Sequence, residues 1–410
     1  MTAPVKQHLI DPEICIRCYT CEMTCPVGAI QHDDNNVVVD PDACDFCLDC
    51  IPVCPTGSID EWRVVQTPYS LEEQFEMDEL PAQEDFASTS ASTDPQTEAG
   101  TDIGADIGIE AHDAAIAALL AQAHSGAGGK ATAPKTAAKP TINLYNPGHP
   151  ATALVQGNYR LTDPASDADV RHIILDLGAL PFPVLEGQSI GIIPPGHDSK
   201  GKPHLPRLYS VSSPRDGERP GFNNLSLTVK REGGGLCSNY VCDLAQGDRV
   251  QITGPFGATF LLPSDPQAHL LMICTGTGSA PFRGFTMRRQ REYKGLENSM
   301  TLIFGARTPR DLPYFGPLAK VPQAVLHKDF AFSREDGSPK QYVQDKLREH
   351  PDKIAALMQD PKAHIYICGL KAMEQGVEEA MRDIARGAGL DWSALRNTLR
   401  QEGRYHVETY

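Results

Sequence analysis

Long apolar runs are missing from this sequence of 410 residues. No stretch approaches the roughly 18 consecutive apolar residues that a membrane-spanning helix needs. The opening residues, MTAPVKQHLIDPE, also lack the apolar core of an export signal. We therefore expect a cytoplasmic protein with no membrane partner.

Positive charge is scarce, since 37 Lys and Arg face 53 Asp and Glu and the formal net charge is −16. This balance argues against nucleic acid as the main partner. The deficit is also local, because the chain between Val64 and Gly129 contains thirteen acidic residues and no Lys or Arg. The acidity therefore belongs to a connecting segment and not to a binding face.

That connecting segment is predicted over residues 65–140, where Glu, Asp, Ser, Ala and Gly give way to a run of Ala, Pro and Lys. Low hydrophobicity with concentrated charge is typical of a flexible linker. A flexible chain of this length spans roughly 50 Å. Within it, residues 109–124 (IEAHDAAIAALLAQAH) are either a transient helix or a helix that docks on a partner protein or on the part of this chain that follows residue 140.

Eight of the twelve cysteines lie in the first 54 residues, in two runs of the form C-x2-C-x2-C-x3-C-P. Structural zinc usually takes two separated pairs, and a disulfide scaffold suits a small exported chain. The runs are instead typical of bacterial ferredoxins with two [4Fe–4S] clusters, in which the last Cys of each run binds the other cluster. We therefore expect one cluster on Cys15, Cys18, Cys21 and Cys54, and the other on Cys44, Cys47, Cys50 and Cys25.

Residues 8–62 resemble such a ferredoxin over its whole length, and we place this domain at residues 1–64. A piece of this size buries little apolar surface. The clusters must therefore contribute to its folding free energy as well as carry electrons.

Motifs suited to a flavin follow residue 141. The segment RLYS at 207–210 combines a cation, an aromatic face and a hydroxyl, and Ser212 follows it. Such a set suits a ligand with a pyrophosphate and a flat ring, although the tetrapeptide alone is a weak signal. The segment GLCSN at 235–239 can open a helix whose N–H groups receive phosphate.

A nucleotide-binding pattern begins at about residue 266. Residues 270–274 (LLMIC) are typical of a buried parallel strand, and the turn TGTGSAP follows directly. A strand, a glycine turn and a helix N-terminus form the usual cradle for a dinucleotide pyrophosphate, although this turn is not GxGxxG. Two more strands that end in glycine, at 302–306 and 364–369, predict a doubly wound α/β domain.

From about residue 150 onward the chain resembles the plant-type ferredoxin–NADP reductase family. The matching pieces are RLYS, GLCSN, GPFG, TGTGSAPFR, FGART, DFAFSRE, YVQ, YICGLKAMEQGVEEAM and the final Tyr410. The resemblance implies a multidomain α+β protein. An antiparallel β-barrel FAD domain would occupy residues 141–265, and a doubly wound NADP(H) domain would occupy residues 266–410.

The resemblance also implies the cofactor contacts. For FAD these are Arg207, Tyr209, Ser210, Ser212, Lys230, Cys237 and Ser238, with Tyr410 on the flavin ring. For NADPH they are Thr275, Gly276, Thr277, Gly278, Ser333, Arg334, Lys340, Tyr342, Gln344 and Gly369. A dianionic 2′-phosphate needs cations and donors, whereas a free 2′-hydroxyl is matched by a carboxylate, so Ser333, Arg334, Lys340 and Tyr342 favour NADPH over NADH.

Four residues match the family's catalytic positions. Ser210 would lie near the flavin N5, Cys368 and Glu408 near the nicotinamide, and Tyr410 would stack on the flavin until the nicotinamide displaces it. We expect Ser210 and Cys368 to position the rings and not to act as acids or bases. The segment between Lys230 and Cys237 departs from the family, because the plant enzymes have a longer loop there, with a tyrosine against the flavin adenine.

A two-[4Fe–4S] ferredoxin joined in this order to a plant-type reductase is similar to the reductase components of aerobic benzoyl-CoA epoxidases. This implies that NADPH gives hydride to FAD, which splits the pair into single electrons for the clusters. The acceptor would be a separate di-iron oxygenase component that acts on benzoyl-CoA. A general NADPH–ferredoxin oxidoreductase and an iron–sulfur redox sensor are the alternatives.

Overall fold

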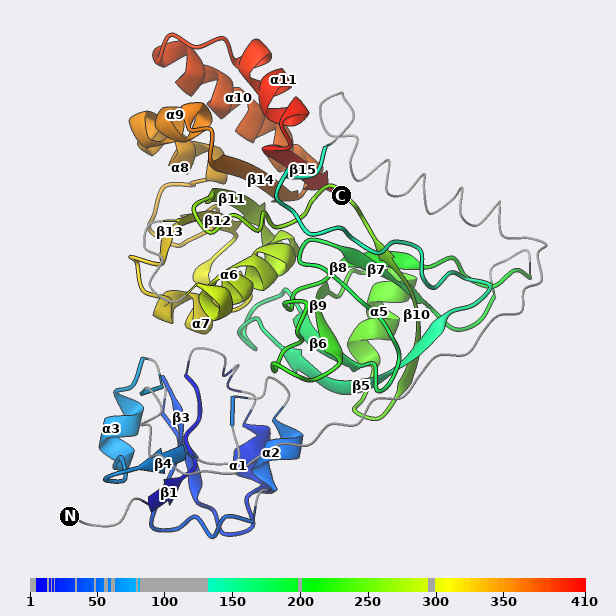
Figure 1. The fold of residues 1–410 in the computed structure, drawn as a ribbon, viewed down its shortest axis with the longest axis vertical. Coiled ribbons are helices and arrows are strands. Elements are labelled where there is room, and N and C mark those ends of the chain that lie inside the picture. The colour runs from blue at the N-terminus through cyan, green and yellow to red at the C-terminus, as the bar shows by residue number, and fades with distance from the viewer. Residues whose placement is uncertain are drawn as a thin grey trace. The chain divides into compact units, whose positions relative to one another are not determined.

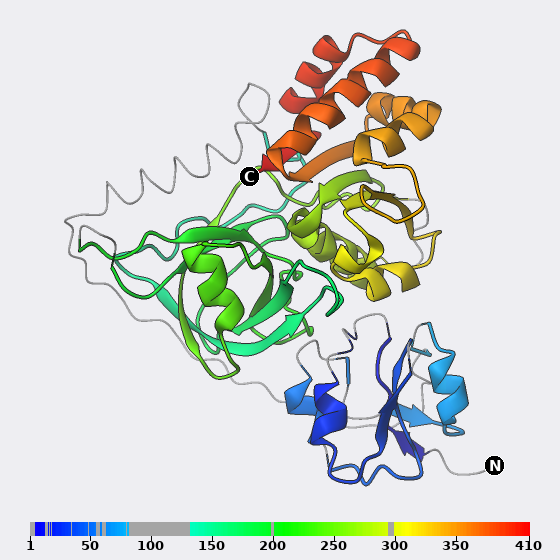
Figure 2. The same cartoon turned by 180° about the vertical axis from the view of Figure 1, so that it is seen from behind.

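The structure is a computed structural model, and Figures 1 and 2 present it from two sides. The chain divides into two compact units, Met1–Ala111 and His112–Tyr410. No helix among the described residues is long and apolar enough to cross a bilayer. The described residues are 5–12, 15, 17, 19–33, 35–47, 49–54, 58–59, 63–78, 80–81, 132–197, 201–293 and 299–410.

Short elements build the first unit. β1 pairs antiparallel with β4, and β2 pairs antiparallel with β3. Its small core combines aliphatic residues such as Ile10, Ile30 and Ile59 with the buried Cys21 and Cys50. The elements are β1 (Val5–Gln7), α1 (Thr20–Thr24), β2 (Ile30–His32), β3 (Val37–Val39), α2 (Cys50–Val53), β4 (Arg63–Val65) and α3 (Leu71–Phe75).

Helix α3 belongs to this unit, so the linker does not begin at residue 65. The Ser70 Oγ accepts from the Glu73 N–H at 3.3 Å, and the Glu73 carboxylate accepts from the Ser70 N–H at 2.8 Å, which caps the helix. The buried Gln74 amide donates to the Val39 carbonyl at 2.8 Å and accepts from the Val39 N–H at 3.1 Å. The acidic composition of this segment suggested a linker, although the segment contains a capping box. It also contains a glutamine whose side chain bonds the Val39 backbone as a neighbouring strand would.

A closed barrel forms the first half of the second unit. Its antiparallel strands run in the order β8-β7-β10-β5-β6-β9. A bridge between Val211 and Leu227 joins the two outer strands, and α5 (Leu236–Asp243) adds Val241 and Cys242 to the barrel core. The expected β-barrel is confirmed. Its strands are β5 (Ala151–Arg160), β6 (Val170–Asp176), β7 (Ser189–Ile193), β8 (Arg207–Ser210), β9 (Asn224–Lys230) and β10 (Arg249–Phe256).

A five-stranded parallel sheet follows, in the order β13-β12-β11-β14-β15. The order reverses between β11 and β14, and ligands of such sheets bind at the carboxyl ends beside this point. The predicted doubly wound domain is therefore confirmed. The strands are β11 (His269–Thr275), β12 (Met300–Ala306), β13 (Leu326–Phe332), β14 (Ala363–Gly369) and β15 (Tyr405–Thr409).

Helices cover both faces of this sheet (Figures 1 and 2). α6 and α7 share one apolar core with one face, and α8 to α11 share another core with the opposite face. The elements are η1 (Gly276–Ser279), α6 (Ala280–Glu292), η2 (Pro309–Asp311), α7 (Phe315–Lys320), α8 (Val343–Glu349), α9 (Pro351–Gln359), α10 (Lys371–Gly387) and α11 (Trp392–Gln401).

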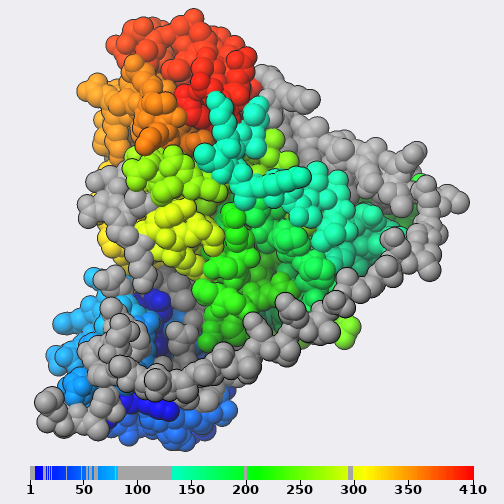
Figure 3. All heavy atoms as spheres, viewed as in Figure 1, coloured from blue at the N-terminus to red at the C-terminus, as the bar shows by residue number. Residues whose placement is uncertain are grey.

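Residues 132–140, expected in the linker, lie on the surface of the second unit. The Ser264 N–H donates to the Thr136 carbonyl at 3.3 Å, and Ala137 forms a bridge with Pro263. Figure 3 shows the first cyan atoms beside the red C-terminal elements. The predicted linker is therefore too long at this end also. Backbone hydrogen bonds hold this segment in place, although its small and polar side chains give no sign of packing. The helix considered at 109–124 lies outside the described residues.

A buried charge pair joins the barrel to the parallel sheet. Arg283 on α6 donates to both carboxylate oxygens of Glu218, at 2.6 and 2.8 Å, and both side chains are buried. His172 on β6 lies 3.3 Å from the same carboxylate. Burial acts to raise the pKa of Glu218, but the neighbouring Arg283 and His172 outweigh it and hold this pKa well below its ordinary range.

Replacing Glu218 by Gln should lower the free energy of unfolding by about 3–5 kcal/mol, because Arg283 would remain buried without a counter-charge. The depressed pKa means that this contribution is complete above the unfolded-state pKa of about 4.3 and is lost as pH falls through the folded-state pKa. Urea unfolding of the holoprotein, followed by flavin fluorescence, measures the loss.

Asp383→Asn is the matched control, since it removes a carboxylate that accepts from Arg348 at 2.9 Å on the exposed surface. It should change the unfolding free energy much less than Glu218→Gln does. Equal losses from the two variants would contradict the importance of the buried pair.

Candidate functional site

Strand β8 presents the RLYS segment beside β7. Arg207 is exposed, whereas Tyr209 and Ser210 are half-buried. Ser210 pairs with Ser189 across the strands, and their hydroxyls are 3.5 Å apart. The Tyr209 ring packs on the barrel core, where burial, with the nearby Cys237, raises its pKa far above the ordinary range. The phenol therefore stays protonated and offers a flat face next to a cation.

Helix α5 begins at a tight glycine turn. Gly235 is the N-cap, and a Cβ there would lie 2.5 Å from the Ser238 Oγ, so a larger residue would require this hydroxyl to turn away. Cys237 is buried and Ser238 half-buried in the first helical turn, where backbone N–H groups have no helical partner. Such a turn can bind phosphate. Lys230 stands at the edge of the loop, in an ion pair with Glu232 at 2.6 Å.

The side chain of Ser212 points into the barrel. Its side chain is fully buried, and its hydroxyl bonds the Ser226 hydroxyl at 2.8 Å inside the barrel. Its carbonyl accepts from Arg283 at 3.0 Å. Ser212 thus supports the contact between barrel and sheet, and its buried hydroxyl gives no support to the predicted FAD contact.

The glycine turn after β11 packs directly on the end of β14. A Cβ on Gly278 would lie 2.1 Å from the Cys368 carbonyl oxygen, and one on Gly369 would lie 2.6 Å from the Thr275 Oγ1. Gly276 and Gly369 have φ values of +56° and +143°. Only glycine fits these backbone positions, so the turn leaves an open backbone surface at the strand ends.

Two candidate residues, Cys368 and Glu408, meet at the carboxyl ends of adjacent strands, and Cys274 lies beside them on a third strand. Cys274 pairs with Cys368, and Cys368 pairs with Glu408. All three are buried. Burial raises the pKa of the Cys368 thiol well above its ordinary range, and the neighbouring Glu408 and Cys274 add to the effect. Cys368 is therefore a neutral thiol and not a base.

Tyr410, the last residue of the sequence, lies over this edge. Its hydroxyl shares a 2.5 Å hydrogen bond with the Thr277 Oγ1, and its backbone N–H donates to the Gly369 carbonyl at 3.0 Å. The side chain is 60% exposed. The backbone is thus held at the strand ends, and among the described residues one hydrogen bond, to Thr277, restrains the ring.

Two exposed cations lie beyond the end of β13. The Ser333 N–H donates to the Ala306 carbonyl at 3.1 Å and the Arg334 N–H to the Arg307 carbonyl at 2.7 Å, which fixes the loop on β12. In the part of the chain that the structure describes, neither Arg334 nor Lys340 forms an ion pair. Their charges are therefore available to an anion.

The return of this loop leads into α8. The Gln341 N–H donates to the Phe332 carbonyl at 2.9 Å, which joins the two halves of the loop. Tyr342, 49% exposed, is the N-cap of α8, and its N–H donates to Asp345 at 2.9 Å. Gln344 follows, and a Cβ on Gly376 would lie 2.8 Å from its amide.

In the first unit, one cavity gathers sulfur atoms from both cysteine runs. Burial raises the pKa of Cys50 to about 11, and nearby Cys44, Cys47 and Cys25 add to the effect. Four such thiolates need positive charge among them, as iron supplies. The Ala29 N–H donates to the Cys25 Sγ at 3.3 Å. The cavity is lined by His8, Cys25, Val27, Ala29, Ile30, Val39, Cys44, Asp45, Cys47 and Cys50.

The other cysteine set is described in part. Cys21 is buried, Cys15 and Cys54 are half-buried, and Cys18 lies outside the described residues. The Cys54 Sγ is 3.1 Å from the Ser58 Oγ. Sequence reasoning missed His8 in the first cavity, because it precedes the cysteine runs and no spacing connects it to them.

Comparisons with known proteins agree with this division. A family model described as a 4Fe-4S dicluster domain matches residues 7–70, and one described as an oxidoreductase NAD-binding domain matches residues 272–379. Ferredoxin–NADP reductase of Thermosynechococcus vestitus is 42% identical over 293 residues, which cover 66% of this chain and 75% of the relative. The cyanelle enzyme of Cyanophora paradoxa is 40% identical over 289 residues, 66% and 79% of the two chains.

Solved structures give the same result. Ferredoxin–NADP⁺ reductase from Plasmodium falciparum aligns with a TM-score of 0.53 and 27% identity, over 66% of this chain and 99% of that one. The same enzyme with 2′P-AMP aligns with a TM-score of 0.53 and 25% identity, over 66% and 100%.

These matches confirm the predicted class of NADPH-dependent oxidoreductase and its cofactors, FAD, NADP(H) and two [4Fe–4S] clusters. The site residues described above agree with such ligands in chemistry: an aromatic face and a helix N-terminus on the barrel, a glycine turn on the sheet, and cysteines in the first unit. The chain therefore belongs to the ferredoxin–NADP reductase family and carries a 4Fe-4S dicluster ferredoxin domain in front of its reductase.

Proposed function

We propose that this chain passes electrons from NADPH through FAD and its own two [4Fe–4S] clusters to a separate oxygenase component. The proposed acceptor is the di-iron epoxidase that acts on benzoyl-CoA in aerobic benzoate degradation. One observation carries the proposal: a single chain joins a dicluster ferredoxin to a reductase whose strand ends gather Cys368, Glu408 and Tyr410.

The barrel residues would hold FAD. Arg207 is placed to neutralise the pyrophosphate, Tyr209 to pack on the ring system, and the first turn of α5 to receive phosphate. When bound, FAD converts a two-electron hydride donor into a source of single electrons. Ser210, on the same strand as Tyr209, would position the reactive edge of the flavin.

The strand ends of the sheet would hold the nicotinamide. The open backbone at Gly276 and Gly278 gives the dinucleotide a close approach. Cys368, as a neutral buried thiol, fills space beside the reacting ring and exchanges no proton in the neutral pH range. Hydride transfer then depends on how well the two rings are placed over each other.

Tyr410 would control access to that position. Its ring must leave before the nicotinamide can stack, and leaving breaks its hydrogen bond to Thr277. The backbone stays anchored at Gly369 while the side chain rotates. Because the nicotinamide must displace the Tyr410 ring, the dinucleotide that gains more binding energy elsewhere is favoured. NADPH gains it from its 2′-phosphate, which NADH lacks.

Arg334 and Lys340 would bind that 2′-phosphate, with Ser333 and Tyr342 as donors. The supports are their exposure, the lack of an ion pair in the described chain, and the related Plasmodium falciparum enzyme, which was solved with 2′P-AMP. No motif in the sequence indicates a site for coenzyme A. The acceptor therefore rests on the domain arrangement and its resemblance to epoxidase reductases.

A general NADPH–ferredoxin oxidoreductase is the second candidate, favoured by the names of the curated relatives. An iron–sulfur redox sensor is a third. The strand-end arrangement of Cys368, Glu408 and Tyr410 disfavours it, because a sensor needs no hydride site.

The acceptor is tested with anaerobic holoprotein reduced by NADPH. Adding the di-iron epoxidase with benzoyl-CoA and oxygen should consume NADPH in proportion to product. Free ferredoxins and cytochrome c serve as comparison acceptors. If they draw electrons while the epoxidase with benzoyl-CoA draws none, the oxygenase assignment fails and the general oxidoreductase remains.

Replacing Arg334 by Ala should raise the KM for NADPH roughly 10- to 100-fold and leave that for NADH almost unchanged, because one charged hydrogen bond to the phosphate is lost. Steady-state kinetics with both dinucleotides measure this ratio. The matched control is Arg348→Ala, at the far end of α8 and paired with Asp383. Equal effects of Arg334→Ala on both dinucleotides would remove the 2′-phosphate assignment.

Replacing Tyr410 by Ser should increase kcat with NADH more than with NADPH and so relax the preference for NADPH, because no ring then competes with the nicotinamide. Tyr410→Phe separates the ring from its hydroxyl: it keeps the ring and loses only the hydrogen bond to Thr277. It should retain most of the preference. An unchanged preference in Tyr410→Ser would show that this ring does not cover the flavin.

A further inference from the structure

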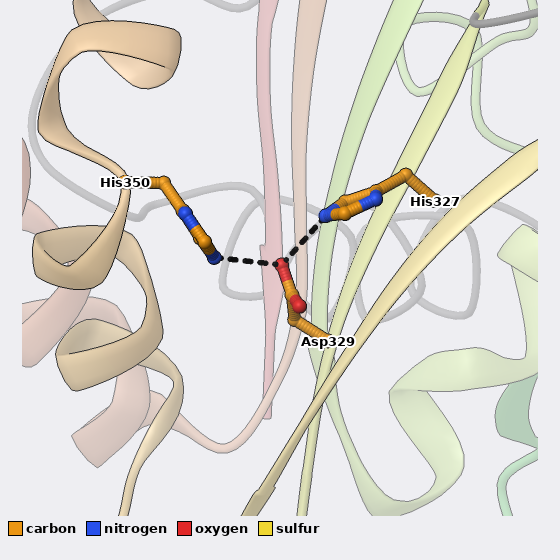
Figure 4. Close-up of side chains that lie close together, drawn as sticks. All are labelled: His327, Asp329 and His350. Atoms are coloured by element: carbon orange, nitrogen blue, oxygen red, sulfur yellow. Dashed lines mark hydrogen bonds and ion pairs between the residues drawn. The ribbon is translucent and has the colours of Figure 1, made fainter. Parts of the chain in front are cut away.

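Two histidines and one aspartate converge on the NADP(H) domain away from the glycine turn. His327 and Asp329 lie two residues apart on β13, so both side chains project from the same face of this outer strand. His350 lies between α8 and α9. Figure 4 shows both imidazoles directed at the Asp329 carboxylate.

The distances suit a small ion. The Nε2 atoms of His327 and His350 lie 3.1 and 3.5 Å from the same oxygen, the Asp329 Oδ2. All three ligand atoms lie within 4.8 Å of one another. Tetrahedral ligands with bonds of about 2.1 Å are about 3.4 Å apart, so two of the separations already have the length that a metal requires.

The backbone holds these side chains in place. β13 is paired along its whole length with β12. The His350 N–H donates to the Leu347 carbonyl at 3.2 Å, and its carbonyl accepts from the Ile354 N–H at 3.0 Å, so His350 ends one helix and starts the next. Ligands on rigid elements lose little conformational entropy on binding.

His327 also has an orienting partner. The Gln323 amide lies 2.8 Å from its Nδ1. Rotation of this amide presents its oxygen to an Nδ1–H, which leaves the Nε2 lone pair free for a metal. Metal-binding histidines usually have such a partner on the second nitrogen.

Solvent can reach the cluster. The side chains of His327, Asp329 and His350 are 31%, 19% and 40% exposed. One cation competes with an ion there: Lys353 on α9 lies near Asp329 and is half-buried. Removing this cation should strengthen the binding of a metal ion, whereas removing a ligand should weaken it.

We propose that His327, Asp329 and His350 bind a divalent first-row transition-metal ion through two imidazole nitrogens and one carboxylate oxygen. Three protein ligands leave a coordination position for water. Imidazole with a single carboxylate suits Zn²⁺ and similar ions, whereas Mg²⁺ prefers oxygen ligands. The bound ion would tie the outer strand to the corner between α8 and α9. None of these residues takes part in the proposed electron transfer.

The test is calorimetric titration of the anaerobic holoprotein with Zn²⁺, with both clusters loaded so that their cysteines are occupied. One Zn²⁺ should bind, and Mg²⁺ should not replace it. His350→Ala and Asp329→Asn should each weaken zinc binding about 100-fold or more, and Gln323→Leu about tenfold. His149→Ala, an exposed histidine elsewhere in the second unit, is the matched control and should bind like the parent.

The Lys353→Met variant distinguishes a metal-binding site from a cluster that is only hydrogen-bonded. Removing this cation should tighten zinc binding, whereas a purely structural role of Lys353 would leave the affinity unchanged or weaken it. The thermal midpoint should rise with Zn²⁺ in the parent and in Gln323→Leu, but not in His350→Ala. Zinc binding that is equal in the parent, His350→Ala and Asp329→Asn, or that Lys353→Met fails to tighten, would overturn the proposal.

Discussion

The buried contact between Arg283 and Glu218 is the constraint on which the reductase geometry depends. FAD belongs to the barrel and NADP(H) to the parallel sheet, so hydride transfer requires a fixed orientation between two separately folded parts. A guanidinium held by both carboxylate oxygens has one geometry, unlike an apolar contact that can slide. His172 extends the network, since its Nδ1 lies 2.6 Å from the Tyr314 hydroxyl. The orientation is therefore specified by directional bonds.

A second constraint is steric. At the strand ends the backbone of the glycine turn approaches β14 so closely that no side chain fits between them. This leaves a surface of backbone groups for a dinucleotide, while Cys368 and Glu408 lie beneath it on neighbouring strands. The charged side chains lie in the far loop, where Arg334 and Lys340 are exposed. In the proposed function, ring placement and dinucleotide choice would belong to different parts of one sheet edge.

The cysteine runs and the strand–glycine–helix pattern were predictable, because the residues of each lie close together in the sequence. Their spacing along the chain determines whether they can bind a cluster or a pyrophosphate. Features built from distant segments were not predictable. The Gln74 side chain makes the hydrogen bonds to Val39, 35 residues earlier in the sequence, that a neighbouring strand would otherwise make. Nothing in the surrounding acidic stretch predicts this contact. Ser212 follows the RLYS segment closely, so the sequence suggests a cofactor contact. Its side chain is buried because the barrel closes beside it, between Val211 and Leu227.

The same distinction applies to the smaller clusters. His327 and Asp329 alternate as any strand residues do, and His350 joins them only through the packing of α8 on β13. Arg334 and Lys340 were found through resemblance to a family, since a serine–arginine pair in a loop has no chemical meaning by itself. The structure adds that neither cation has an internal counter-charge in the described chain.

The anchoring of Tyr410 bears on how the protein should be produced. Its carbonyl accepts from the Lys371 N–H at 3.2 Å, so the last peptide unit is part of the sheet edge. A purification tag fused after this residue would start beside the glycine turn and disturb this backbone contact.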